Sequence, residues 1–183
     1  MIDNEGGVEY AEEIRNESTG LAQSRPVFVN LANSATVTNV LTLTAYDVTY
    51  VVPANALVAG SVLHFKAVVR ITADNLAETT LVEARLGGTR ILTSSAVNAA
   101  AGDTIVIEGF VITRAVPGAV VDSVGGGSVV FSTGAAGTLA TATTMADGVT
   151  FATNGALTLD FRVIYSAAGG NSSFLESLIV WIS

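Results

Sequence analysis

The chain has 183 residues, half of them apolar, with no cysteine and a formal charge of −8. This length suits one domain the size of a β-sandwich and is too short for two domains with separate full cores. The absence of cysteine excludes disulfides, thiolate catalysis and cysteine-containing metal sites. The eight basic residues are scattered, which argues against nucleic acid as a partner because phosphate binding needs clustered lysine and arginine.

The first 25 residues differ in composition from the rest of the chain. Six acidic residues precede residue 18 against a single Arg15. Val8, Ala11 and Ile14 recur at helical spacing, so a short helix can form, although one this brief is marginal in isolation. Two interpretations stay open: a frayed acidic tail, or an arm that a partner orders through these three residues. We expect an acidic arm at 1–25 and one β domain at 26–183.

From Pro26 onward the apolar period is two, which predicts strands separated by turns. The strands are expected at 62–72, 80–86, 104–114 and 157–165. Each predicted strand carries charges on its second face, with both signs mixed as cross-strand pairing requires. These charges are Lys66, Arg70, Glu83, Arg85, Glu108, Arg114, Asp160 and Arg162. We interpret them as ladders on a face toward solvent or toward another subunit.

Two later stretches depart from this simple alternation. Residues 125–155 are rich in glycine, alanine and threonine, and predict a hairpin or extension of small residues. The terminal run 174–182 is apolar on both faces apart from Glu176 and Ser177, so it should lie centrally or in an interface, because an exposed apolar edge invites aggregation. No run of about 18 apolar residues predicts a membrane span, and the first residues lack the pattern of a secretory signal.

The residues that carry chemistry do not form a catalytic pattern. His64, the single histidine, has no nucleophile motif with it, and we assign it a structural or surface role. Glu83, Glu108 and Asp160 each have an arginine within a few residues, which keeps a carboxyl ionised instead of favouring proton donation. We therefore expect no enzyme, no cofactor and no metal site. A weak calcium site at Asp74 and Asn75 or at Asp147 is the alternative.

A glycan-binding surface is the other alternative for this chain. Sugar-binding sandwiches usually stack sugar rings on exposed aromatic side chains. Trp181 and the phenylalanines occupy apolar rows and are expected in the core, so Tyr46 and Tyr50 are the candidate glycan contacts.

Three stretches carry a family resemblance: VVPANALVAGSVLHFKA at 51–67, LVEARLGGT at 81–89 and GDTIVIEG at 102–109. They resemble the jelly-roll modules of tailed-phage virion proteins, such as head-decoration, head-fibre and tail-fibre components. The resemblance spans roughly 36–183 and contains no catalytic signature. Ser61 stands where the family pattern has aspartate.

The resemblance implies an all-β fold, namely an antiparallel two-sheet jelly-roll sandwich of the tumour-necrosis-factor-like type, which commonly forms a homotrimer. The second strand faces carry Val68, Phe110 and Ile164 among the charges, and we predict that these residues form the oligomer interface.

Together these observations predict a non-enzymatic structural protein on the virion surface of a tailed phage or phage-like particle. It would be made in the host cytoplasm without a signal peptide and anchored by its arm to the major capsid protein or another virion protein. The rival hypothesis is a receptor- or glycan-binding sandwich that recognises a host-surface glycan.

Overall fold

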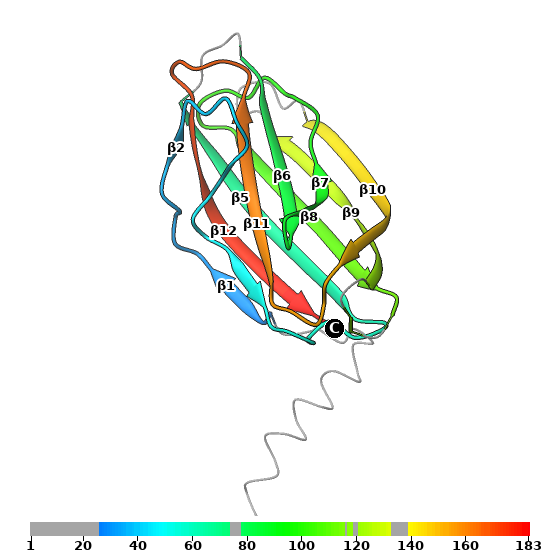
Figure 1. Ribbon diagram of the computed structural model, residues 1–183. Coiled ribbons are helices and arrows are strands. Elements are labelled where there is room, and N and C mark those ends of the chain that lie inside the picture. The colour runs from blue at the N-terminus through cyan, green and yellow to red at the C-terminus, as the bar shows by residue number, and fades with distance from the viewer. Residues whose placement is uncertain (1–25, 74–77, 116, 119–120, 133–138) are drawn as a thin grey trace, which may run out of the picture.

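The computed structural model describes residues 26–73, 78–115, 117–118, 121–132 and 139–183 (Figure 1). The predicted arm with Val8, Ala11 and Ile14 lies outside these residues, as do Asp74 and Asn75. The side chains at 121–122 and 139–148, among them Asp147, are also outside the description.

The described part of the chain is built from β-strands. In chain order they are β1 (Phe28–Asn30), β2 (Val37–Thr38), β3 (Thr44–Ala45), β4 (Tyr50–Val52), β5 (Val62–Ala73), β6 (Thr80–Leu86), β7 (Thr89–Thr93), β8 (Thr104–Thr113), β9 (Val121–Ser132), β10 (Leu139–Phe151), β11 (Leu157–Tyr165) and β12 (Ser172–Ile182). The strands predicted at 62–72, 80–86, 104–114 and 157–165 correspond to β5, β6, β8 and β11 within one residue at each end.

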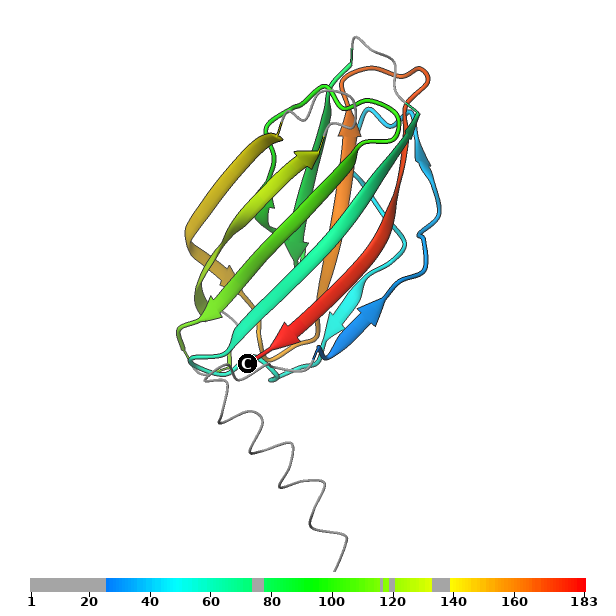
Figure 2. The ribbon, with the colours of Figure 1, turned by 180° about the vertical axis from the view of Figure 1, so that it is seen from behind.

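These strands form two antiparallel sheets packed face to face. Sheet A has the order β1-β12-β5-β8-β9-β10, with β2 also paired to β12, and it faces the viewer in Figure 2. Sheet B has the order β3-β11-β6-β7, with β4 also paired to β11, and it faces the viewer in Figure 1. The predicted fold class, an all-β antiparallel two-sheet sandwich, is confirmed. The chain crosses between the sheets at β2–β3, β4–β5, β5–β6, β7–β8, β10–β11 and β11–β12.

The small-residue stretch forms a long hairpin that widens sheet A. Strands β9 and β10 pair from Val121 opposite Phe151 to Ser132 opposite Leu139, with a register shift between Ala146 and Val149. The prediction of a hairpin at 125–155 is confirmed, and the hairpin begins slightly earlier than the composition suggested.

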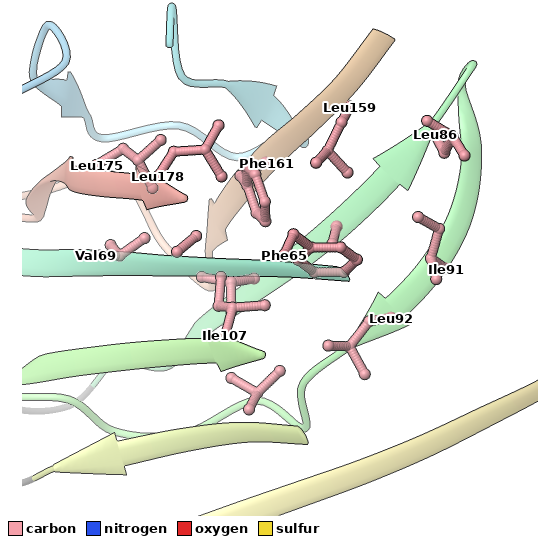
Figure 3. Packing of buried hydrophobic residues seen from close by; sticks show 14 of the residues in the cluster. Phe65, Val69, Leu86, Ile91, Leu92, Ile107, Leu159, Phe161, Leu175 and Leu178 are labelled. Carbon is pink, nitrogen blue, oxygen red and sulfur yellow. The ribbon is translucent and has the colours of Figure 1, made fainter. Parts of the chain in front are cut away.

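The core fills the space between the two sheets (Figure 3). Phe65 from β5 in sheet A meets Phe161 from β11 in sheet B edge to face, with ring centroids 5.6 Å apart. Leucine, isoleucine and valine side chains from both sheets surround this pair, including Val69, Leu86, Ile91, Leu92, Ile107, Leu159, Leu175 and Leu178. The alternation read from the sequence assigns these inward faces because successive strand side chains point to opposite sides.

Gly109 on β8 leaves room for the Phe65 ring, and this contact yields a prediction. A Cβ at Gly109 would overlap the ring of Phe65, which is itself fully enclosed. Gly109→Ala should therefore lower the free energy of unfolding by about 1–3 kcal/mol, the usual cost of overpacking. Phe65→Leu should relieve part of that cost, so the double variant is more stable than the sum of the two single effects predicts.

Urea unfolding of the two single variants and the double variant measures this coupling. Gly155→Ala is the matched control, because a Cβ there meets only one backbone oxygen at an ordinary 3.8 Å. Strictly additive effects of the Gly109 and Phe65 changes would contradict the packing described.

Candidate functional site

The outer face of sheet A is the most unusual surface of the described molecule. We call it the sheet A face and define it by outward side chains of five neighbouring strands. They are Val29 of β1; Phe174, Ile179 and Trp181 of β12; His64, Lys66, Val68 and Arg70 of β5; Val106, Glu108, Phe110 and Ile112 of β8; and Val130 of β9. Apolar side chains dominate this set, and all of them are at least partly exposed.

Cross-strand register arranges these side chains in rows. Trp181 lies opposite His64, which lies opposite Phe110, and the His64 and Phe110 ring centroids are 6.5 Å apart. A parallel row brings together Val68, Val106 and Val130. Side chains in such rows lie about 4.5–5.5 Å apart at Cβ. The face therefore presents one aromatic and one aliphatic stripe across sheet A.

The described charges of the sheet A face form pairs and balance each other. Lys66 Nζ lies 2.5 Å from Glu108 Oε1, with both side chains about half exposed. Arg70 donates from Nη2 to both carboxylate oxygens of Glu176, at 3.2 and 3.0 Å. Although the whole chain carries −8, these two ion pairs, the second completed by Glu176 at the bulge of β12, carry as many positive as negative charges, so long-range repulsion from them is small.

The structure brings together two of the three predicted interface residues. Val68 and Phe110 both lie on the sheet A face. Ile164 lies opposite Leu81 on the outer face of sheet B, on the other side of the sandwich. The expectation that the three share one surface is wrong, because periodicity distinguishes inward from outward but does not say to which sheet a strand belongs.

The outer face of sheet B carries a network of arginines and carboxylates. Glu83, only 5% exposed, accepts from Arg85 at 2.8 Å and has Arg90 at 3.7 Å. Asp160 accepts from Arg162 Nε at 2.6 Å, and this hydrogen bond raises the pKa of the Arg162 guanidinium. Such pairing suits a structural ladder and leaves both carboxylates engaged with cations. Glu108, the third carboxylate considered as a proton donor, lies on sheet A and forms an ion pair with Lys66.

Of the two predicted glycan contacts, Tyr46 is wrong. Its side chain is 1% exposed, and its hydroxyl lies 2.7 Å from Ser173 Oγ, which also lies 2.6 Å from the Tyr165 hydroxyl. This buried three-hydroxyl cluster joins the two sheets. Tyr50 is half-buried and its ring lies against Phe28, with centroids 5.2 Å apart. The two tyrosines therefore form no joint sugar platform.

The buried cluster predicts how stability depends on alkaline pH. Burial raises the pKa of both Tyr46 and Tyr165 above the ordinary tyrosine value of 10.0. Between that value and the higher folded pKa, the unfolded chain releases protons that the folded chain keeps, so the free energy of unfolding falls as pH rises above about 10. Tyr46→Phe should cost about 1 kcal/mol at neutral pH and make the alkaline decline shallower by up to about 1.4 kcal/mol per pH unit.

Urea unfolding at a series of pH values from neutral to alkaline measures both effects. Identical slopes for the variant and the unaltered chain would show that Tyr46 is not buried as described. Tyr50→Phe serves as the comparison: burial raises the pKa of Tyr50 as well, but its ring keeps more access to water than that of Tyr46, so its effect on the slope should be smaller.

Sequence reasoning missed Trp181 as a surface residue. The register of β12 against β5 shifts between Leu175 and Ser177, so Glu176 is an extra residue in the strand. One inserted residue reverses which later side chains point inward. Leu178 and Val180 consequently enter the core, while Ile179 and Trp181 lie on the sheet A face and are only partly buried. An apolar run on both faces conceals such a bulge from periodicity.

Within the described residues, no group of three or more histidine, aspartate or glutamate side chains is placed to hold a metal ion. The same part of the chain has no helix that is long and apolar enough to span a membrane.

No known family model matches the chain, and no curated protein matches its sequence. Among solved structures, it is similar to the CBM2 module of the evolved Dit of Lactobacillus casei BL23 phage J-1, with 11% sequence identity. The similarity covers 87% of this chain and 92% of that module, at a TM-score of 0.37. A likeness this remote supports no inference about what the present chain binds.

Proposed function

We propose that this protein is a non-enzymatic structural component of a tailed phage or phage-like particle that associates with itself through the sheet A face. In this proposal the assembly is a homotrimer displayed on the capsid or tail surface. The acidic segment 1–25 attaches it to the major capsid protein or another virion protein. The resemblance at 51–67, 81–89 and 102–109 supports the virion setting and the trimer.

The single observation that carries self-association is the composition of the sheet A face. Val29 and Ile112 are exposed large apolar side chains on this face, and the aromatic and aliphatic stripes add partly exposed ones on either side of the Lys66–Glu108 pair. Monomeric soluble proteins rarely leave contiguous apolar patches of several hundred Å² in water, and such patches usually mark contact sites.

The extent and charge of the face favour a second copy of the chain as its occupant. Four long strands at about 4.8 Å spacing and about ten residues of 3.4 Å rise span roughly 650 Å². A standard interface takes about 800 Å² from each partner, so this face with its rim is large enough. Balanced charges also let copies of an acidic protein approach here with little repulsion.

Light scattering on the full chain and on a chain beginning at Pro26 tests this proposal. A trimer in both samples would place assembly in the β domain and leave the acidic segment free for attachment. A monomer in both would overturn the proposal. Deleting 1–25 should also abolish binding to the particle while the β domain stays folded, and unchanged binding would refute the anchoring role.

The aromatic stripe favours one rival, a glycan-binding module on a host surface. Trp181, His64 and Phe110 form a partly exposed ring row of the kind on which sugars stack. Glycan-array binding that is lost with Trp181→Ala, by a protein that stays monomeric, would favour this rival. Tyr50→Ala is the matched control on a ring outside the row.

A further inference from the structure

His64 lies on β5, between β12 and β8, within the surface that the proposed function buries. It is the single histidine of the chain, it is exposed in the isolated molecule, and it lies between Trp181 of β12 and Phe110 of β8. Imidazole is the side chain whose charge ordinarily changes between about pH 5 and pH 8. A group that can gain a charge in this range therefore lies inside an apolar contact surface.

The charged side chains around His64 leave no described side-chain carboxylate free to balance a protonated imidazole. The terminal carboxylate at Ser183 lies one row further along, where the Ser183 backbone pairs with Val62. On its own strand the nearest charge is Lys66, which has the same sign as imidazolium. On β8 the nearest titratable side chain is Glu108, and it binds Lys66. On β12 the side chains beside His64 are Trp181 and Ile179, and the nearest side-chain carboxylate, Glu176, binds Arg70. Protonation would therefore add a positive charge that no side chain of the face is free to pair with.

We propose that His64 makes self-association through the sheet A face depend on pH, an inference that rests on the proposed function. Neutral imidazole packs between Trp181 and Phe110 in the assembly. Imidazolium, which water stabilises in the free chain, loses that hydration when a second copy covers the face. Within the range where imidazole binds a proton, each further pH unit of acidification weakens assembly by up to about tenfold for each buried His64.

The test compares the full chain with full-length His64→Gln by light scattering at about pH 8 and about pH 5.5, the range that imidazole spans. The unaltered chain should assemble at the higher pH and dissociate at the lower, whereas His64→Gln should stay assembled at both. His64→Phe, which keeps a ring in the aromatic stripe, is a second uncharged variant with the same expected result.

The outcomes separate the switch from the assembly itself. An unaltered chain that stays assembled at both pH values, or a His64→Gln chain that dissociates just as the unaltered chain does, overturns the switch and leaves self-association standing. A chain that is monomeric at about pH 8 overturns the proposed function and the switch together. If neither variant assembles, the fluorescence emission of Trp181, the chain's one tryptophan, is measured in the unaltered chain as a function of pH. If the Trp181 emission and the mass from light scattering change with the same pH midpoint, the switch is supported. If their midpoints differ, the switch is overturned.

Discussion

A chain with aspartate in place of Val68 should be monomeric at concentrations where the unaltered chain assembles. Val68 lies in the aliphatic stripe, next to Val106. The flanking cations Lys66 and Arg70 already bind Glu108 and Glu176, so a carboxylate at position 68 would be an additional, uncompensated negative charge buried in the assembly. An unpaired charge at the centre of an interface typically weakens binding by 2–5 kcal/mol or more, at least about 30-fold per contact. The free chain should tolerate the change because this position borders water before assembly.

Ile164→Asp is the matched control for this prediction. Ile164 is also a partly buried, outward β-branched residue in the interior of a strand, but it lies on sheet B. Light scattering on both variants, with urea unfolding to confirm that each stays folded, makes the comparison. Dissociation by Ile164→Asp and not by Val68→Asp would move the interface to the opposite side of the sandwich.

Phe65→Ala should lower the free energy of unfolding by about 3–5 kcal/mol, the usual cost of deleting a buried phenylalanine. The ring is 2% exposed and fills the space between Gly109 on its own sheet and Phe161 on the other sheet. Alanine leaves a cavity that neighbouring strands, fixed by their hydrogen bonds, fill only in part. Small domains have total stabilities of about 5–15 kcal/mol, so this variant should approach the limit of folding.

Phe110→Ala provides the comparison for the core prediction, because that ring lies on the sheet A face and is partly exposed. We expect the free energy of unfolding to change by less than about 1 kcal/mol in the monomeric state. Urea unfolding of both variants measures the difference. Equal losses would mean that Phe65 does not occupy the centre of the core.

The sequence predicted the strands well because their inward faces obey a strict period of two. Leu63, Phe65, Ala67, Val69 and Ile71 all enter the core as expected. Local alternation depends only on which side chains avoid water, and that information is present in each strand separately. The apolar run 174–182 predicts a strand that lies centrally or in an interface, and β12 lies between β1 and β5 in sheet A.

The candidate site was predicted only in part, because it depends on long-range pairing. Val68 and Ile164 look alike in their own strands, and only the pairing of β5 with β8 and of β11 with β6 separates them. Tyr46 precedes Asp47 in a polar stretch, yet its contact with Ser173 spans most of the chain. Trp181 lies on the outer face and not in the core because Glu176 is an extra residue that breaks the alternation of β12. None of these relations leaves a local pattern.

The central claim is that the sheet A face is covered in the assembled protein, and thiol labelling tests it most directly. The chain has no cysteine, so Val106→Cys and Ile164→Cys each place a single thiol on an outward, partly exposed position of sheet A and sheet B respectively. In the native full-length assembly, the thiol at position 106 should react much more slowly than the thiol at 164, and mild denaturant should remove the difference. Equal reaction rates in the native protein would contradict the account.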